Sequence, residues 1–338
     1  MTDCVCFGEV LLRLTPPERE LLLQTPRLTV SFGGAEANVA VSLAALGSSA
    51  KMVSIVPENA LGRAARDELR RRGVDVSAVR FGPGRMGIYF ATPGAVMRPA
   101  QVLYDRAGSA FTRADLRALD WDRELAGAGW LHVSGVTAAL DARCAEAVIQ
   151  AARAANRLDV PASFDCNYRA TLWSGREDDA PGVFRELMSC ATIVFGDERD
   201  LTLALGSARG AGGVLERRRA AAAAAFAAFP RLTRVASTIR VRHSSDCQGL
   251  SAVMFTRDGG EYATRPSRLQ GIVDRIGAGD AFAAGLLHAL RTGSEAREAL
   301  DFALAAAALK HAIPGDFNLA GEAEVRALLA GDTIDVRR

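Results

Sequence analysis

The 338-residue chain lacks three features that would each point to a particular class of protein. It has no apolar run of 18 residues free of charge, so a transmembrane helix is not expected. It has no excess of charge of one sign, since 41 basic residues nearly balance 39 acidic ones. A net charge of +2 produces no field that attracts nucleic acid or an anionic membrane, and we expect neither as a partner. No internal repeat is visible.

Cysteine is sparse as well, and its placement argues against disulfides or a metal site. The six cysteines are scattered, and Cys4 and Cys6 lie two apart in an apolar segment that reads as a strand. That spacing points both side chains to one face of a buried element, where free thiols behave as small apolar groups. The N-terminal residues carry no basic segment of the kind that opens a signal peptide, so we expect a cytoplasmic location.

Alternating strand-like and helical segments are the main feature of the pattern. Such alternation is typical of a parallel sheet with helices on both faces. Two stretches, 10–32 and 85–106, break it, and the second contains paired strand-like runs. We therefore predict one α/β domain over 1–338, a three-layer α/β/α fold with a mainly parallel central sheet and a small β lid formed by about 10–32 and 85–106. The predicted strands are 4–8, 51–56, 130–135, 160–165 and 192–196, and the predicted helices are 35–46, 60–72, 142–157 and 215–229.

The familiar nucleotide-binding loops are missing or misplaced. No Walker GxxxxGK[ST] sequence occurs, and the GxGxxG match at 82–87 contains a proline and is followed by a strand-like run. The dinucleotide fingerprint requires a strand before it and a helix after it, so this match is not expected to bind a cofactor. A nucleotide must therefore be bound by a different structural motif.

The turn 273–280 (VDRIGAGD) could form such a motif, because it leads directly into an apolar helical stretch. Gly277 and Gly279 have no Cβ to obstruct a ligand, and the first N–H groups of a helix are unpaired. Gly277, Ala278 and Gly279 would therefore form an anion hole. Asp280 beside them would serve as a base, kept ionised at neutral pH by the helix N-terminus. The alternative is that Asp280 only caps the helix.

A second glycine pair opens a helix near the N-terminus, in the stretch 33–40 (GGAEANVA). Gly33 and Gly34 would let a polyol approach the backbone, and Asn38 offers a donor and an acceptor to hydroxyl groups. The alternative is a glycine turn with a capping asparagine.

Together these stretches resemble the paired sequence motifs of the ribokinase-like, or phosphofructokinase B type, carbohydrate kinases, over essentially the whole chain. In that family the aspartate of the C-terminal motif is the catalytic base. More narrowly, four stretches resemble the 2-keto-3-deoxygluconate kinases, which phosphorylate the terminal hydroxyl of a sugar acid. These stretches are 8–17 (GEVLLRLTPP), 33–38, 167–174 (NYRATLWS) and 310–318 (KHAIPGDFN).

The narrower resemblance implies a set of substrate-binding residues. A sugar acid needs a cation, and Arg106 and Arg169 stand beside tyrosines in the matching segments, where an arginine fork suits a carboxylate. By resemblance Gly34, Tyr89, Tyr104, Arg106 and Arg169 contact the sugar acid, with both tyrosines supplied by the lid. Either arginine alone is more often a surface residue, so the interpretation rests on the joint occurrence of both with the stretch 33–38.

The resemblance also implies ATP and Mg²⁺. Family members carry an Asn-x-x-Glu element that organises the metal and the phosphates, and here Asp197 and Asp200 take those positions. Both keep oxygen ligands, which suits Mg²⁺. The stretch 237–240 (STIR) supplies Ser237, Thr238 and Arg240 for the phosphates, and the remaining nucleotide contacts implied are Asn167, Gly277, Gly279 and Asn318.

Phosphorylation of 2-keto-3-deoxygluconate is thus the function that the sequence favours. A kinase of a neutral sugar such as fructose or ribose, or of a nucleoside, is the nearest alternative. The alternative from another class is a sugar-acid sensor that kept the fold, which the altered residues at 197–200 favour slightly. Because an apolar lid often closes against another subunit, we expect a homodimer or a higher homo-oligomer.

Overall fold

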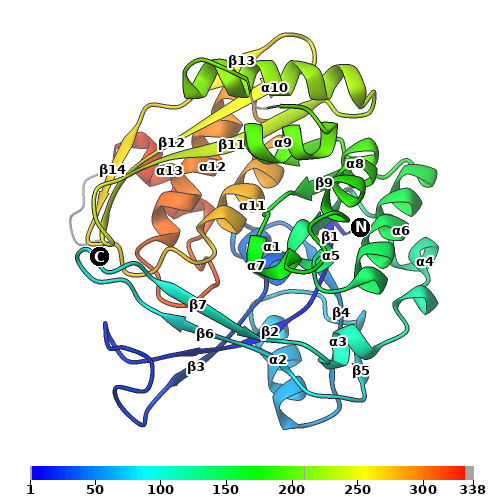
Figure 1. The fold of residues 1–338 in the computed structure, drawn as a ribbon, viewed down its shortest axis with the longest axis vertical. Coiled ribbons are helices and arrows are strands. Elements are labelled where there is room, and N and C mark those ends of the chain that lie inside the picture. Colours follow the sequence, from blue (N-terminus) through cyan, green and yellow to red (C-terminus); the bar gives the residue numbers. More distant parts are fainter. Residues whose placement is uncertain (1, 209, 332–338) are drawn as a thin grey trace.

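The computed structural model describes residues 2–208 and 210–331, and it contains one large sheet and one small one (Figure 1). The large sheet has the strand order β13-β12-β11-β10-β9-β8-β1-β4-β5, with β14 also paired to β12. All pairs from β5 to β11 are parallel, and those of β12 are antiparallel. The strands are β1 (Cys4–Phe7), β4 (Ala50–Pro57), β5 (Val79–Gly82), β8 (Leu131–Ser134), β9 (Ala162–Asp165), β10 (Ile193–Phe195), β11 (Arg234–Arg242), β12 (Cys247–Thr256), β13 (Glu261–Ala263) and β14 (Ser267–Gln270).

Helices cover both faces of this sheet, and each face has its own hydrophobic core. Every residue of β1, β8 and β10 is buried, as expected for parallel strands with helices on both sides. One face carries α1 (Ala35–Ala45), α2 (Ala60–Arg71), α11 (Ala278–Arg291), α12 (Ala296–Lys310) and α13 (Glu322–Ala330). The other carries α3 (Ala110–Arg113), the 3₁₀ turn Leu116–Ala118, α4 (Trp121–Glu124), α5 (Gly135–Ala138), α6 (Ala142–Arg157), α7 (Ala170–Trp173), α8 (Ala180–Cys190), α9 (Glu198–Leu205) and α10 (Val214–Ala228).

The small sheet has the order β3-β2-β6-β7 and lies at the lower left in Figure 1. Its strands come from the two stretches assigned to the lid, namely β2 (Leu11–Thr15), β3 (Thr29–Gly33), β6 (Gly87–Thr92) and β7 (Gln101–Asp105). Several of its large apolar side chains are exposed, among them Val30, Val102 and Leu103. The lid therefore presents an apolar surface to solvent.

The three-layer prediction is confirmed, and the predicted strand and helix boundaries agree with the structure to within about two residues. Residues 82–87 join β5 to β6, so the GxGxxG match is followed by a strand, as expected. Cys4 and Cys6 are buried with their Sγ atoms 3.9 Å apart, and the cysteines are free thiols. In the described part of the chain, no helix combines the length and the apolarity that crossing a bilayer demands.

Candidate active site

The turn before α11 has the geometry expected of an anion hole. Gly277 is the N-cap of the helix with φ 84°, and a Cβ there would lie 1.9 Å from the carbonyl oxygen of Asp316, so only glycine fits. At Gly279 the nearest atom to such a Cβ would be Nη2 of Arg240, 4.0 Å away. Among the hydrogen bonds of the described residues, none is donated by the N–H of Gly277 or Gly279, whereas the N–H of Ala278 donates to the carbonyl of Arg275 at 3.3 Å. Two of the three predicted donors are therefore available.

Asp280 lies at the first turn of α11, only 7% exposed, and its Oδ2 accepts a 2.6 Å hydrogen bond from Nδ2 of Asn38. Burial raises its pKa to about 7, and the charges of Asp316 and Glu36 add to the rise, against the bond from Asn38 and the charge of Arg169. Our expectation of an ordinary, fully ionised carboxylate was wrong, because desolvation outweighs the helix N-terminus. A pKa near 7 is better suited to a general base.

The glycine pair before α1 brings that helix against two acidic residues. A Cβ on Gly33 would lie 2.1 Å from Oδ2 of Asp316, and one on Gly34 would lie 2.3 Å from the backbone oxygen of Glu9. The space that we reserved for a polyol is thus filled by the protein at both glycines. Asn38 remains as the polar side chain at the start of this helix. Its Oδ1 is buried without a hydrogen-bond partner, which is expected of an atom that accepts a hydrogen bond from a ligand hydroxyl.

The lid places Tyr89, Tyr104 and Arg106 together. The two tyrosine rings are 6.2 Å apart between centroids, and the Arg106 guanidinium lies 5.8 Å from the ring centre of Tyr104. Arg106 is buried, and its Nε and Nη2 both donate to Oε2 of Glu9, at 2.8 and 2.6 Å. Its Nη1 has no partner. The expected free arginine fork is therefore largely engaged by Glu9, and the NH₂ group at Nη1 is left without a partner.

Arg169 differs from Arg106 because it is exposed. It precedes α7, directly after β9, and its charge lowers the pKa of Asp280, Asp165 and Asp200. Among the described residues, no hydrogen bond or ion pair of its side chain is seen. Arg169 thus lies near three buried carboxyl groups, and its own side-chain donors are free.

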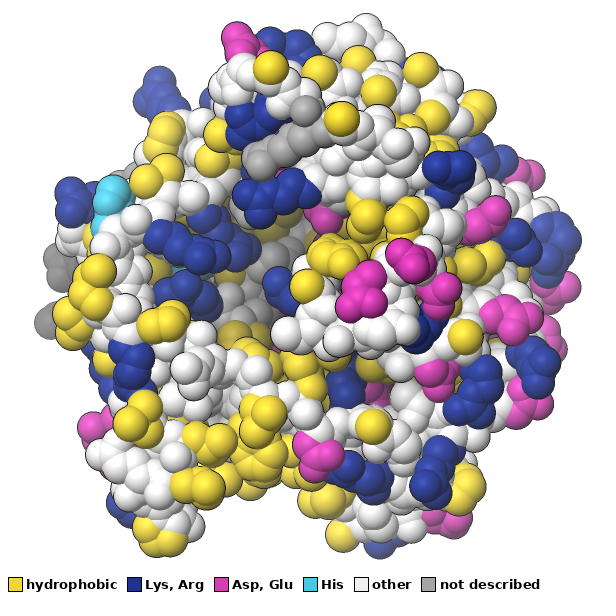
Figure 2. Space-filling model, in the orientation of Figure 1, with side chains coloured by type: hydrophobic (Ala, Val, Ile, Leu, Met, Phe, Trp, Pro, Cys, Tyr) yellow, Lys and Arg dark blue, Asp and Glu magenta, His cyan; other side chains and the backbone are white. Residues whose placement is uncertain are grey.

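Arg240 is part of a wider cluster of positive charge. Although it keeps solvent exposure, its place within the hollow lowers its pKa by desolvation, and the charges of Arg169, Arg242 and Arg275 lower it further. Figure 2 shows Lys and Arg side chains gathered on the left rim of a hollow, on the side of β11, β12 and β14 in Figure 1. Such clustering of like charge is unfavourable unless an anion binds.

Ser237 and Thr238 precede Arg240 on β11, and the Oγ of Ser237 and the carbonyl of Thr238 both accept from Arg218, at 2.9 and 3.1 Å.

Three carboxyl groups lie at the ends of β9 and β10. Asp197 caps α9 by accepting from the N–H of Arg199 at 2.8 Å, and Asp200 accepts from the N–H of Asp197 at 2.9 Å. Burial raises the pKa of Asp200 to about 7, with Asp197 as the next cause. Burial also raises the pKa of Asp165 to about 8, followed by the charges of Asp280 and Asp200. No group of three or more acidic, His or Cys side chains among the described residues could hold a metal alone.

The two asparagines assigned to the nucleotide differ in their surroundings. Asn167 lies between Asp165 and Arg169 in a left-handed conformation, φ 36°, with its N–H bonded to Asp165 at 3.1 Å. Asn318 is buried away from solvent, where its Nδ2 donates to Ser42 at 3.0 Å and its Oδ1 accepts from Ala320 at 3.2 Å. The Asn318 amide thus holds the C-terminal segment on α1.

Sequence reasoning missed the buried ion pairs that connect these parts. Arg13 of β2 contacts Asp274 at 2.6 Å and Oδ1 of Asp316 at 2.9 Å, and the hydroxyl of Tyr89 donates to the same Oδ1. Asp316 thereby links the lid to the turn before α11. The sequence did contain a sign of these ion pairs, because Arg13 stands within the apolar run Leu11 to Leu14. A charged side chain in a buried strand requires a partner of opposite charge. Asp165 was missed too, although it stands directly before the motif that starts at Asn167.

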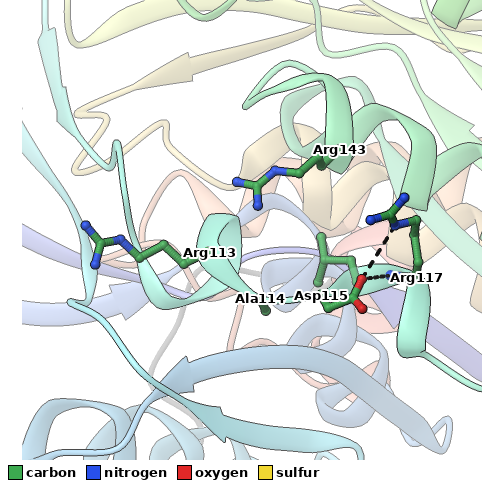
Figure 3. Close-up of a pocket in the computed structure, with 6 residues that line it drawn as sticks. Arg113, Ala114, Asp115, Arg117 and Arg143 are labelled. Atoms are coloured by element: carbon green, nitrogen blue, oxygen red, sulfur yellow. Dashed lines mark hydrogen bonds and ion pairs between the residues drawn. The ribbon is translucent and has the colours of Figure 1, made fainter.

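A small cavity of about 120 Å³ lies elsewhere, between α3, the 3₁₀ turn and α6 (Figure 3). Arg113, Arg117 and Arg143 line it, and Arg117 pairs with Asp115 at 3.6 Å. Its arginines are exposed, and it contains none of the predicted site residues. The candidate active site is therefore the hollow between the lid and α11.

Known proteins resemble this chain in both sequence and fold. The model of the pfkB family carbohydrate kinases matches residues 1–316. The 2-dehydro-3-deoxygalactonokinase of Haloferax volcanii is 33% identical over 345 residues, covering 99% of each chain. The crystal structure of 2-dehydro-3-deoxygluconokinase from Thermotoga maritima is 36% identical with a TM-score of 0.91, over 98% of this chain and 100% of that one. A putative Ribokinase II from E. coli, in complex with ATP and Mg²⁺, shares the fold at 18% identity and a TM-score of 0.78, over 98% and 100% of the two chains. The ribokinase-like fold is thereby confirmed, and the chain belongs to the pfkB family of carbohydrate kinases.

Proposed function

We propose that the protein transfers a phosphoryl group from ATP to the terminal hydroxyl of a 2-keto-3-deoxy sugar acid, with 2-keto-3-deoxygluconate giving its 6-phosphate. The observation that carries the proposal is the buried Asp280, bonded to Asn38, beside the free N–H groups of Gly277 and Gly279. Relatives named for two such acids support the choice of substrate. We also propose a cytoplasmic location, which an ATP-dependent sugar-acid kinase fits.

Asp280 acts as the base. Its pKa of about 7 leaves it half ionised at neutral pH, and the hydrogen bond from Asn38 holds one oxygen so that the other can face the acceptor hydroxyl. The proton passes to Asp280 as that hydroxyl oxygen attacks. Because phosphoryl transfer has a loose transition state, positioning contributes more than basicity.

The glycine turn supplies the anion hole. The N–H groups of Gly277 and Gly279 donate no hydrogen bond within the described residues and are available to a phosphoryl group beside Asp280, and each preorganised donor of this kind contributes roughly 3 kcal/mol to transition-state stabilisation. Arg240, whose Nη2 lies 4.0 Å from the Cβ position of Gly279, places a positive charge at the same point. The charges of Arg242 and Arg275 near it add to a positive site that fits a polyphosphate.

Two carboxylates fit Mg²⁺, which prefers oxygen ligands and keeps several waters when bound with phosphates. Burial is the main cause of the raised pKa of both Asp165 and Asp200, and the charge of Asp200 raises that of Asp165 further; a divalent cation bound to them would offset both effects. ATP supplies the phosphoryl group and Mg²⁺ neutralises part of its charge. We assign the metal to Asp165 and Asp200, and to Asp197 the cap of α9 that orients Asp200.

The substrate carboxylate is assigned to Arg169, with Arg106 and the two lid tyrosines beside it. Arg169→Ala should raise the KM for the sugar acid by about 10- to 100-fold, the loss of one charge-assisted hydrogen bond, with the KM for ATP nearly unchanged. Steady-state kinetics with each substrate varied checks this. Arg117→Ala, at an exposed arginine of the small cavity, is the control. Equal rises in both KM values would contradict carboxylate recognition by Arg169.

Arg106→Ala should raise the same KM, and it should also lower stability because Glu9 loses its partner in a buried position. The Arg106→Ala, Glu9→Gln double variant separates the two effects. It should recover stability and keep the high KM.

The proposed function is tested by an assay of ADP release with Mg²⁺-ATP. The acceptors are 2-keto-3-deoxygluconate, its C4 epimer 2-keto-3-deoxygalactonate, gluconate, fructose, ribose and adenosine. We expect the highest kcat/KM with one of the two keto acids. Preference for fructose, ribose or adenosine would overturn the sugar-acid assignment, and the absence of turnover with every acceptor would overturn the kinase assignment.

We further propose that two copies associate through the exposed apolar face of the lid, which includes Val30 and Leu103. Figure 2 shows hydrophobic side chains gathered over this part of the molecule. The protein should be dimeric at micromolar concentration in light scattering, and Leu103→Glu should shift it toward the monomer because a charge would be buried in the interface. Leu158→Glu, at an exposed leucine on the opposite side of the fold, is the control. A monomeric wild type would refute the association.

A further inference from the structure

Lys310 is a buried cation for which the mechanism above has no use. It is the last residue of α12 and is 0% exposed. Its Nζ donates to the carbonyl oxygen of Ile313 at 2.9 Å and makes a long contact of 3.5 Å with the carbonyl oxygen of Asp274. Among the ion pairs within residues 2–208 and 210–331, none includes this ammonium group. Two backbone carbonyls are its direct partners.

An ammonium group in this position is costly, because burial without an ion pair disfavours the charged form. A methionine or leucine would fill the same volume without that cost. Burial lowers the pKa of Lys310, whereas the nearby charges of Asp274, Asp316 and Asp280 oppose that shift. The charge is therefore favoured by the three carboxylates that surround the anion hole.

The two carbonyls belong to segments that must stay in register for the anion hole to form. Asp274 lies in the turn that leads to Gly277, and Ile313 lies in the loop that leads to Asp316, whose carbonyl oxygen contacts Gly277. The Cε of Lys310 would lie 3.3 Å from a Cβ on Gly277. Lys310 thus stands directly behind the glycine of the hole, between both segments.

We propose that Lys310 is a positioning residue for phosphoryl transfer, whose ammonium group ties the Asp274 turn to the Ile313 loop and sets a fixed positive charge behind the N–H groups of the anion hole. The inference rests on the proposed function. It assigns Lys310 a part in the transition state and none in binding the sugar acid, which the lid and Arg169 contact.

The first test compares Lys310→Met with Lys51→Met. Lys51 is the other lysine of the chain and forms an ion pair with Glu124 at 2.7 Å, away from the site. Lys310→Met should lower kcat by about 10- to 100-fold with the KM for the sugar acid within about twofold, as when an interaction made in the transition state is lost. Lys51→Met should keep the wild-type kcat. An unchanged kcat in Lys310→Met would overturn the inference and leave the kinase standing, whereas an inactive wild type would overturn both.

The second test is chemical rescue. Lys310→Ala leaves a space next to two carbonyl oxygens, and ammonium or methylammonium chloride should restore at least a few-fold of the lost kcat. Tetramethylammonium chloride at equal ionic strength cannot donate a hydrogen bond and should not restore it. Equal responses to the three salts would show that the side chain acts only through packing, and would overturn the inference.

The third test uses the wild-type protein, so that it stands even where the variants fold poorly. With two lysines in the chain, labelling with ¹³C-lysine gives two Cε signals, which Lys51→Met assigns. Binding of Mg²⁺-ADP with the sugar acid should shift the Lys310 signal and leave that of Lys51 in place. A Lys310 signal that does not respond would overturn the inference.

Discussion

Replacing Asp280 by asparagine should lower kcat by about 10²- to 10⁴-fold while the protein stays folded. The amide cannot accept the proton of the attacking hydroxyl, but it has the shape of the carboxyl group and can still meet Nδ2 of Asn38 through its oxygen. Because the carboxyl group is buried, its neutral replacement also removes a desolvation cost. Turnover and a thermal melt of both proteins check the prediction, and wild-type turnover in the variant would refute the role of Asp280.

The pH dependence of the wild type follows from the same residue. Its pKa is raised to about 7, and the ionised form is the active one, so kcat/KM should fall as pH drops through about 7. Asp165 and Asp200 titrate in a similar range. A bound cation lowers the pKa of its ligands. If Asp165 and Asp200 cause the fall in the pH profile of kcat/KM, the midpoint of that fall should therefore move with the Mg²⁺ concentration. If Asp280 causes it, the midpoint should stay in place. A pH-independent kcat/KM between 5 and 8 would contradict the assignment.

Arg13→Met should destabilise the protein by about 3–5 kcal/mol. Arg13 lies between Asp274 and Asp316, and all three side chains are at most 11% exposed. Without the guanidinium, two buried carboxylates lose their counter-charge and repel each other. Urea unfolding with a linear extrapolation measures the change in free energy.

The matched control is Arg297→Met, at an exposed pair with Asp301 on α12. Surface pairs of this kind contribute about 0.5 kcal/mol or less. A loss in Arg13→Met as small as that of the control would mean that Asp274 and Asp316 do not depend on Arg13. Adding Asp316→Asn to Arg13→Met should recover part of the stability, because one of the two unpaired charges is removed.

Much of the fold could be predicted because local patterns and tertiary structure agree. The strands of the parallel sheet are short apolar runs, and the Ala-rich helices between them have clear boundaries. The turn at Gly277 was predictable for the same reason. Its φ of 84° is a conformation that favours glycine, and a glycine directly before an apolar helical stretch can be recognised in the sequence.

The chemistry of the site was harder to predict because it depends on contacts between distant segments. The pKa of Asp280 is set by burial and by Asp316 and Glu36, none of which a local sequence window contains. Arg106 was read as a free cation, but its charge is engaged by Glu9, which lies 97 residues earlier. The motif that held Asp316 was recognised, and its role as a link between Tyr89 and Arg13 required the coordinates.

The contacts that complete the site also set when it can exist during synthesis. Asn38 meets Asp280 across 242 positions of sequence, and Arg13 meets Asp316 across 303. A nascent chain that has emerged only as far as the middle of the sheet contains the lid and Asn38, but no base and no anion hole. The site can therefore form only after residues 274–316 have left the ribosome, and products truncated before that segment, which could still fold in part, would have no means of consuming ATP.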